Sequence, residues 1–511
     1  YARQTGKVGV VLVTSGPGAT NTITGIYTAM MDSVPLVVLT AQTITSNLGK
    51  DAFQECDTSG MTFTTVKHSY LVKDPNDLPR IMKEAFHIAQ TGRPGPVLID
   101  LPKDVLADPC TAPFTDEMDL PGYKVPTYAK ESDIDEAAKI IQNSKKPLLL
   151  VGHGAMISGA SRQVKELAEK INAPVTSTLL GLGTFPANHP LSLGMLGMHG
   201  TVFANKAIVE ADLIFSIGSR FDDRITGKVE EFGQNAKIIH IDIDAAEKNK
   251  ILKPDVFLHG DVKLVLEQLL PKVSSLKTEA WNKTIDTWKK RFPLSYPRQG
   301  GLRMQHVIRT LSEITQGKAI LTVDVGQHQM WTAQFFDANY PRQLHNSGGA
   351  GTMGFGFPSS IGAAIGNTTG WPVFSIVGDG GFQMTMSELS TAAIHKLPIK
   401  ILVLDNKYLG MVRQWQDMFY DKRYSSVDLE GNPNFVKLAE AYGIPGLRAR
   451  RNADVAKVLQ KAIDYNDGPI LVHFECEKED NVFPMIPAGA SITSIITETP
   501  KVKLEKPTGS T

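Results

Sequence analysis

The sequence has 511 residues, of which 42% are hydrophobic, so it is too long for one core and long enough for about three domains of roughly 150 to 200 residues each. Lys plus Arg and Asp plus Glu both number 53, which gives no electrostatic reason to expect a nucleic-acid or an acidic-membrane partner. We therefore expect a large multidomain globular protein that holds any anion by local geometry.

The cysteine content and the hydropathy of the sequence indicate the cellular compartment in which the protein is expected. Cys56, Cys110 and Cys476 lie far apart without a CxxC pair, which argues against a disulfide framework or a structural zinc site and fits a reducing compartment. No apolar run approaches the roughly 20 residues that cross a bilayer, so we expect a soluble, cytoplasmic protein.

The first residue is Tyr1, and "YARQTGKVGVVLV" is typical of a helix end running into a strand. We expect that the true beginning is missing, which leaves organellar targeting open.

Short apolar, β-branched runs alternate with amphipathic helical stretches along the chain. This pattern predicts an α/β fold with doubly wound parallel sheets in three domains. The first domain is predicted at 1–110, with a polar, Pro-containing linker over 110–132. The second is predicted at 130–270 and the third at 300–490, followed by a C-terminal tail at 491–511.

The stretch "FSIVGDGGFQM" at 374–384 places an Asp between glycines after a strand-like run. We predict a strand over 372–377, a helix over 387–396 and a strand over 399–404, which form one right-handed βαβ unit. Asp379 follows the first strand and Asn406 follows the second, 27 residues later. The two side chains should therefore meet at the carboxyl edge of the sheet, where doubly wound folds bind ligands.

This edge has the composition of a Mg²⁺-diphosphate clamp. Gly378, Gly380 and Gly381 let the backbone approach a ligand, and the following helix offers free N–H groups to an anion. An Asp carboxylate, an Asn amide oxygen and the backbone carbonyl of Tyr408 suit Mg²⁺, which keeps phosphate oxygens among its ligands. Either turn alone is more often a plain βα turn, but the spacing and the apolar strand before each favour a ligand site.

"GDGGFQM" followed by "LDNKYLGM" resembles the thiamin diphosphate motif, GDG then about two dozen residues then NN. Asp405 stands where the motif has its first Asn, and Asn406 matches the second, which is the metal ligand in the family. The resemblance implies a pyrimidine-binding domain, a central domain and a diphosphate-binding domain.

Within this superfamily the chain is similar to the catalytic subunit of the acetohydroxyacid (acetolactate) synthase family over essentially all of its length. The stretches that carry this likeness are "SGPGATN", "DAFQE", "GRPGPVLIDLPKDV", "GMLGMHG", "GSRFDDRITG", "GQHQMW", "SGGAGTMGFG" and "GMVRQWQ".

The resemblance implies roles for individual residues. Met353 matches an apolar wedge that bends thiamin diphosphate, although a lone Met is more often a core residue. Gln54 and Phe53 match positions near the thiazolium, Lys103 lines the substrate funnel, and Arg224 and Trp415 match contacts to the second 2-ketoacid. From sequence alone, Gln54 and Lys103 could be ordinary surface side chains, and Arg224 could be a plain ion-pair partner. The diphosphate side is implied to include Val325, Gly326, Gln327, His328, Gly351, Met353, Gly378, Asp379, Gly380, Gly381, Asn406, Tyr408, Leu409, Gly410 and Met411, with Asp379, Asn406 and Tyr408 as metal ligands.

A flavin site is also implied. "VGHG" after a strand is a weak dinucleotide signal by itself. Together with other stretches of the second block it resembles the family's FAD site, in which FAD is required without a net redox step. The matching residues are Arg93, Gly152, Gly154, Thr178, Leu179, Leu196, Gly197, Met198, His199, Gly218, Arg220, Asp222, Ile225, Asp242 and Asp261.

The implied reaction is decarboxylation of pyruvate and transfer of the two-carbon unit to pyruvate or 2-ketobutyrate, in the synthesis of valine, leucine and isoleucine. The resemblance implies thiamin diphosphate, Mg²⁺ and FAD as cofactors, a homodimer or homotetramer whose sites lie between subunits, and a small regulatory subunit as a further partner. The Glu that activates thiamin in the family lies upstream of "YARQTG", so we expect this piece alone to be poorly active.

Two alternatives remain at this point. One is another enzyme with both cofactors, such as a pyruvate oxidase or a glyoxylate carboligase, against which "RFDDRITG" and "GMVRQWQ" argue. The other is a non-catalytic homologue. The presence of Asp379, Asn406, Gln54, Arg224 and Trp415 argues against it, since a scaffold has no physical need for all five.

Overall fold

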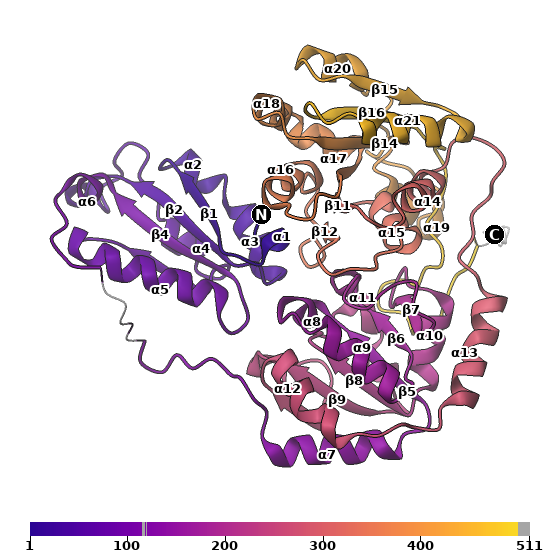
Figure 1. Cartoon of the computed structure of the whole chain (residues 1–511). Helices are drawn as coiled ribbons and strands as arrows, with labels where there is room; N and C mark the ends of the chain where they lie inside the picture. Colours follow the sequence, from indigo (N-terminus) through magenta and orange to yellow (C-terminus); the bar gives the residue numbers. More distant parts are fainter. Residues whose placement is uncertain (115–117, 119, 499–511) are drawn as a thin grey trace, which may run out of the picture.

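The computed structural model describes residues 1–114, 118 and 120–498. Figure 1 shows three α/β parts, the first beside the third and the second below them. Each part contains one parallel sheet with helices packed on it, so the predicted fold class is confirmed. Residues 115–117 and 119 of the predicted linker and 499–511 of the predicted tail lie outside the described residues.

The first sheet has four strands in the order β1-β2-β4-β3. Strand β4 is internal and buried throughout, whereas β1 lies at an edge, and its exposed residues Val10 and Leu12 alternate with buried or partly buried ones. Leu12 on β1 is therefore 73% exposed. The strands are β1 (Gly9–Val13), β2 (Leu36–Gln42), β3 (His68–Leu71) and β4 (Pro96–Pro102), and the helices are α1 (Ala2–Thr5), α2 (Pro17–Thr20), α3 (Ile23–Met31), α4 (Thr58–Thr62), α5 (Leu78–Gln90) and α6 (Lys103–Ala107).

The second sheet has six strands in the order β10-β9-β8-β5-β6-β7. The chain changes direction across the sheet between β5 and β8, and a crevice opens beyond the carboxyl ends of strands at such a point. The strands are β5 (Pro147–Val151), β6 (Val175–Ser177), β7 (Ser192–Met195), β8 (Leu213–Ile217), β9 (Lys237–Asp242) and β10 (Val256–His259), and the helices are α7 (Glu131–Asn143), α8 (His153–Ile157), α9 (Ser161–Lys170), α10 (Val202–Glu210), α11 (Asp223–Thr226), α12 (Val262–Leu269) and α13 (Glu279–Arg291).

The third sheet has the order β12-β11-β13-β14-β16-β15, and its strand order reverses between β11 and β13. Its apolar strands are buried because helices cover both faces. The strands are β11 (Ile320–Val323), β12 (Leu344–Asn346), β13 (Val373–Gly378), β14 (Ile399–Asp405), β15 (Gly446–Ala449) and β16 (Ile470–Glu475), and the helices are α14 (Met304–Thr315), α15 (Gln327–Phe335), α16 (Gly356–Gly366), α17 (Asp379–Thr385), α18 (Leu389–Ile394), α19 (Gly410–Phe419), α20 (Phe435–Ala441) and α21 (Asn452–Asp464).

The predicted βαβ unit is present in this sheet. Strands β13 and β14 pair in parallel, with Val373 opposite Ile399 and Gly378 opposite Leu404. The connection differs from the prediction, because α17 begins directly after β13 and a short turn separates it from α18. Helix formation thus starts at Asp379 itself, and the free N–H groups of its first turn lie at the predicted clamp.

Among residues 1–114, 118 and 120–498, no helix is both long and apolar enough to span a membrane.

Candidate active site

Asp379 and Asn406 lie at the same edge of the third sheet. Asp379 is the first residue of α17, and Asn406 directly follows β14. Because β13 and β14 are paired in parallel up to Gly378 and Leu404, both residues leave the sheet at one level. Asp379 is 1% exposed and Asn406 is 5% exposed, so these polar groups are held inside the protein.

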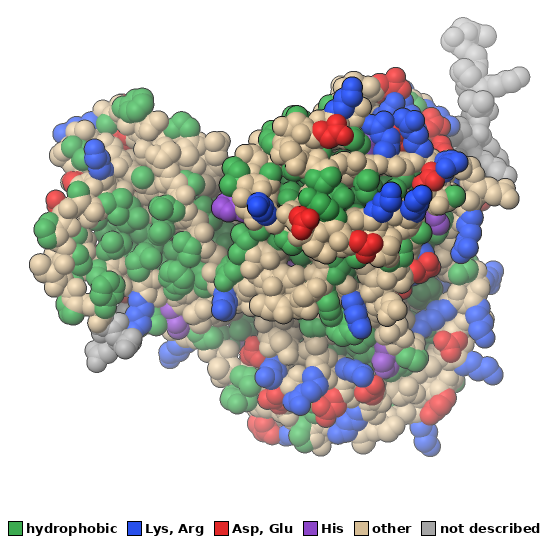
Figure 2. Space-filling model, turned by 45° about the horizontal axis from the view of Figure 1, so that its top comes forward, with side chains coloured by type: hydrophobic (Ala, Val, Ile, Leu, Met, Phe, Trp, Pro, Cys, Tyr) green, Lys and Arg blue, Asp and Glu red, His purple; other side chains and the backbone are tan. Residues whose placement is uncertain are grey.

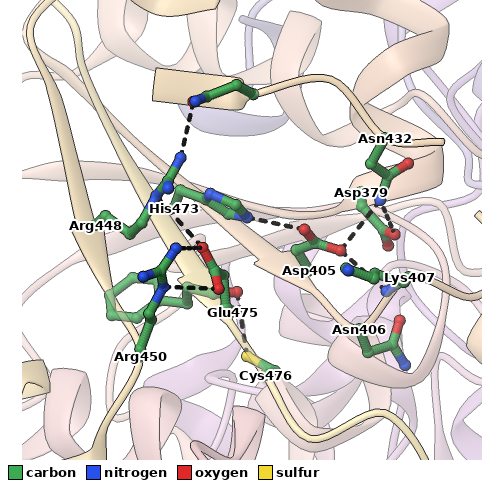
Figure 3. A network of polar contacts seen from close by, with 12 residues as sticks. Asp379, Asp405, Asn406, Lys407, Asn432, Arg448, Arg450, His473, Glu475 and Cys476 are labelled. Carbon is green, nitrogen blue, oxygen red and sulfur yellow. Dashed lines mark hydrogen bonds and ion pairs between the residues drawn. The ribbon is translucent and has the colours of Figure 1, made fainter. Parts of the chain in front are cut away.

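A network of polar contacts surrounds Asp379 (Figure 3). The amide nitrogen Nδ2 of Asn432 donates to Oδ2 of Asp379 at 2.7 Å and to Oδ1 of Asp405 at 3.1 Å. The other oxygen of Asp405 lies 2.8 Å from Nε2 of His473. Burial, followed by the charge of Asp405, raises the pKa of Asp379 to about 8. Burial acts on Asp405 in the same direction, but hydrogen bonds led by that of His473 outweigh it and lower its pKa.

The glycines near Asp379 and Asn406 allow close packing around the clamp. A Cβ added at Gly378 or at Gly326 would lie 2.9 Å from the ring of His328, and one at Gly410 would overlap the side-chain oxygen of Gln327. Gln327 also accepts a hydrogen bond from Asn406 at 3.3 Å. His328 is 5% exposed, and its Nε2 has no hydrogen-bond partner among the described residues.

These groups fit a magnesium diphosphate. Hard oxygen donors suit Mg²⁺, which usually takes only one or two carboxylates from the protein and the remaining ligands from phosphates and water. The described part of the chain contains no group of three or more His, Cys, Asp or Glu side chains that could hold a metal by themselves. The unpaired nitrogen of His328 and the first turn of α17 are suited to hydrogen bonding with an anion.

Asp324, which directly follows β11, was not among the site residues predicted from the sequence. Its carboxylate accepts hydrogen bonds from the backbone N–H of Val325 at 2.6 Å and of Gly354 at 2.9 Å. It thereby joins the "VGQH" loop to the loop that carries Met353. Burial raises the pKa of Asp324 to about 6. The signal that could have found it is the one used for Asp379, an acidic residue at the carboxyl end of a buried strand.

A cavity of about 790 Å³ lies among the three parts of the molecule, which is large enough for a cofactor. Most residues of the predicted flavin site line it: Arg93, Gly154, Thr178, Leu179, Leu196, Met198, His199, Gly218, Arg220, Asp222, Ile225, Asp242 and Asp261.

Gly152 and Gly197 are the two residues of the predicted flavin set that do not line the cavity. A Cβ added at Gly152 would overlap the backbone carbonyl of Gly218, and one at Gly197 would overlap that of Arg224. The absence of a side chain at these two glycines therefore allows backbone segments to pack closely behind the cavity wall.

Two buried side chains in this wall have unused polar atoms. Gln329 is 6% exposed and His199 is 4% exposed, and in the described structure the Nε2 atom of each has no hydrogen-bond partner. A buried polar group without a partner is costly, which favours a ligand that supplies one. The residues present therefore fit a large polar cofactor such as FAD. Gln329 was not among the predicted site residues, although it lies in the quoted motif "GQHQMW".

Arg224 and Trp415 line the same cavity, from α11 and α19. The guanidinium of Arg224 lies 3.8 Å from Asp223, and both side chains are more than half exposed. An exposed pair of this kind contributes little, so Arg224 retains its capacity to bind a carboxylate. Val325, Gly351 and Met411, which belong to the predicted diphosphate side, also line the cavity.

Gln54, Phe53 and Lys103 do not line this cavity. All three are exposed on the first part of the molecule, and Phe53 is 89% exposed. Gln54 has a left-handed backbone with φ of 58°, and a Cβ added at Gly16 would lie 3.0 Å from its Cβ. Figure 2 shows hydrophobic side chains gathered on the visible face of this part.

Family models match all three parts of the chain. The N-terminal TPP binding domain of thiamine pyrophosphate enzymes matches 1–61, the central domain matches 134–269, and the C-terminal TPP binding domain matches 324–474. The chain is therefore a member of the thiamine pyrophosphate enzymes.

Relatives define the family more closely. The chain is 46% identical to the acetolactate synthase of Mycobacterium bovis over 503 residues, which cover 96% of this chain and 81% of the relative. It is 46% identical to the acetolactate synthase large subunit of Corynebacterium glutamicum over 97% of this chain and 81% of the relative. It is 44% identical to the chloroplastic acetolactate synthase of Arabidopsis thaliana, over 98% and 76%. The chain belongs to the acetolactate synthase family, transferases of branched-chain amino acid synthesis, and the predicted family is confirmed.

Proposed function

We propose that the chain decarboxylates pyruvate and transfers the two-carbon unit to a second pyruvate or to 2-ketobutyrate, which yields 2-acetolactate or 2-aceto-2-hydroxybutyrate. One observation carries this proposal. Val325, Gly351 and Met411, from the loops around the diphosphate clamp, line the same cavity as Arg224 and Trp415. This shared lining supports a single site in which the proposed cofactor clamp lies beside a pocket for the second ketoacid.

Thiamin diphosphate, when bound, supplies the electron sink that decarboxylation requires and that no side chain provides. Asp379, the side-chain oxygen of Asn406 and the backbone carbonyl of Tyr408 would hold Mg²⁺, with the diphosphate as the remaining partner. His328 would donate to the diphosphate through its buried, unpaired nitrogen. Met353 would support the ring system from the loop that Asp324 fixes.

The acceptor ketoacid would bind between Arg224 and Trp415. A guanidinium can hold a carboxylate through two parallel hydrogen bonds, and an indole ring provides an apolar wall that selects a small alkyl group. Trp415 packs against Phe419 with ring centroids 5.3 Å apart, which orients the indole. Arg224 therefore provides binding and orientation, and Trp415 provides shape.

FAD would occupy the part of the cavity formed by the second sheet. At the crevice beyond β5 and β8, the backbones of Gly154 and Gly218 lie in close contact. The N–H of Gly154 donates to the carbonyl of Gly218 at 3.0 Å. Arg93 reaches this wall from the first part and lies 3.4 Å from both Asp244 and Glu247. The role proposed for FAD is structural.

We propose three domains at 1–110, 130–270 and 300–490, assembled as a homodimer or homotetramer in the cytoplasm. The exposure of Gln54, Phe53 and Lys103 supports this assembly, because these residues would complete the site of a second subunit from outside. The Corynebacterium relative is named as a large subunit, and a small regulatory subunit is proposed as a partner on that ground.

The test is to extend the chain upstream by the segment expected to carry the activating Glu and to measure acetolactate formed from pyruvate, with thiamin diphosphate, Mg²⁺ and FAD each omitted in turn. Product that depends on all three supports the proposal. Acetate or hydrogen peroxide formed in place of acetolactate would contradict it and would indicate an oxidase. Product that persists without FAD would overturn the flavin assignment alone.

A further inference from the structure

Asn432 lies between two buried carboxylates. The amide group donates both of its hydrogen bonds to them, to Asp379 at 2.7 Å and to Asp405 at 3.1 Å (Figure 3). Asp379 is 1% exposed and Asp405 is 4% exposed, so neither carboxylate can exchange this donor freely for bulk water. Asn432 belongs to neither motif from which the metal site was predicted.

The orientation of the Asn432 amide is determined by its neighbours. Nε2 of Gln383 donates to Oδ1 of Asn432 at 2.8 Å, which identifies Oδ1 as the acceptor and leaves Nδ2 to face the carboxylates. Gln383 also donates to the backbone carbonyl of Asp379 at 3.2 Å. The amide is thus fixed from the same helix, α17, that begins with Asp379.

The backbone that carries Asn432 is attached to the loop of the proposed metal ligands. The N–H of Leu409 donates to the carbonyl of Val427, and the N–H of Leu429 donates to the carbonyl of Lys407, both at 2.8 Å. An isolated antiparallel bridge joins Tyr408 and Asp428 between them. The segment 427–432 therefore follows the loop 405–409 as a unit.

Asp405, the neighbouring carboxylate, is held by partners of its own. His473 contacts one of its oxygens at 2.8 Å, and the backbone N–H of Lys407 donates to the other at 2.9 Å. Asn432 adds a bond to that second oxygen. Asp405 is therefore restrained at both oxygens, whereas Asn432 contacts only Oδ2 of Asp379.

We propose that Asn432 is a positioning residue for the metal ligand Asp379. Its amide fixes the rotation of the Asp379 carboxylate and keeps the neighbouring Asp405 from competing for the ion. The inference rests on the proposed Mg²⁺ site. It extends that site by a third segment of the chain, since partners that orient a metal ligand from outside typically change metal affinity about 10- to 100-fold when removed.

The test is a titration of the full chain with Mn²⁺ in the presence of thiamin diphosphate, with free and bound Mn²⁺ distinguished by electron paramagnetic resonance. Asn432→Ala removes both hydrogen bonds, and we expect its Mn²⁺ affinity to be about 10- to 100-fold weaker than in the unsubstituted chain. Asn434→Ala is the matched control. It removes the same side chain two residues further on, where the amide oxygen instead accepts bonds from Lys437 N–H and Arg448, and we expect unchanged Mn²⁺ affinity.

Gln383→Leu keeps the conclusion independent of whether Asn432→Ala folds. It removes the bond that orients the Asn432 amide and the weaker bond to the backbone carbonyl of Asp379, but leaves the Asn432 side chain in place. We therefore expect a smaller loss of Mn²⁺ affinity in the same direction, with an unchanged circular dichroism spectrum. Wild-type affinity in the folded variants would overturn the role of Asn432 while leaving the metal site intact. Failure of the unsubstituted chain to bind Mn²⁺ would overturn the metal site and this inference together.

Discussion

The carboxylate of Asp32 accepts a hydrogen bond from the backbone N–H of Gly349 at 2.7 Å, across 317 residues of sequence. The same carboxylate pairs with Arg3, and the backbone carbonyl of Asp32 lies 3.0 Å from Nδ1 of His153 in the second part. Asp32 is 1% exposed. Contacts from all three parts of the molecule thus meet at the end of α3, beside the proposed flavin cavity.

Asp32→Ala should strongly destabilise the protein, because it leaves Arg3 and the Gly349 N–H without their partner in a buried environment. Breaking a buried pair typically costs about 3–5 kcal/mol. The free energy of unfolding in urea measures this loss. Asp77→Ala is the control, since its pair with Arg80 is more than half exposed on both sides, and equal stability of the two variants would refute the prediction.

Arg224→Ala should impair acceptor binding. Loss of a charged hydrogen-bonding partner costs about 1.5–3 kcal/mol, which corresponds to roughly a 10- to 150-fold lower kcat/KM for pyruvate. Arg224→Lys should retain only part of the kcat/KM of the unsubstituted chain, because an ammonium group lacks the planar fork of a guanidinium. Steady-state kinetics test this, with the exposed Arg423→Ala as control. An unaffected kcat/KM in Arg224→Ala would exclude the role.

His153 should make the protein sensitive to acid. Burial, with a further contribution from Arg3, lowers its pKa to about 4 from the ordinary value of 6.5. The neutral ring is therefore favoured in the folded state, and its contribution to stability is complete above pH 6.5 and is lost as the pH falls towards 4. His153→Gln should show a smaller drop in urea midpoint between pH 7 and pH 5 than the unsubstituted chain. The exposed His395→Gln should behave as the unsubstituted chain, and the same drop in both variants would contradict the prediction.

Gly410→Ala should weaken thiamin diphosphate binding while the fold persists. An added Cβ would overlap Oε1 of Gln327 and lie 2.9 Å from Nδ2 of Asn406, so one of these side chains must move. Such overpacking typically costs about 1–3 kcal/mol. Calorimetric titration with thiamin diphosphate and Mg²⁺ measures the effect. Gly431→Ala is the control because no atom lies within 4 Å of its added Cβ, and equal affinities would argue against close packing at the clamp.

Mixing two inactive variants tests whether sites form between subunits. Gln54→Ala alters the first part and Asp379→Ala the third, so a mixed dimer would contain one intact site and one site with both changes. Random pairing should restore about a quarter of the unsubstituted activity. Acetolactate formation after unfolding and refolding the two chains together measures it. Absence of recovery, although sedimentation shows dimers, would indicate that each site lies within one subunit.

The site residues that could be predicted from the sequence are those that directly follow a strand. Asp379 and Asn406 were found because apolar strands, glycines and a spacing of 27 residues are local features, and parallel strands bring their carboxyl ends to one edge. The same rule applied to β11 would have found Asp324. Asn432 has no such signal, because it lies in a loop after α19 and reaches Asp379 only through the folded path of the chain.

The sequence by itself determined the α/β class, the βαβ unit around Asp379 and the family, since hydrophobic periodicity and short motifs depend on neighbours along the chain. Only the tertiary structure decided that Arg224 and Trp415 share a cavity with the flavin residues, that Gln54 and Phe53 lie outside it, and that Asn432 and His473 restrain the carboxylates. These relationships join segments tens to hundreds of residues apart, and packing within and between domains, which local propensity does not encode, brings them together.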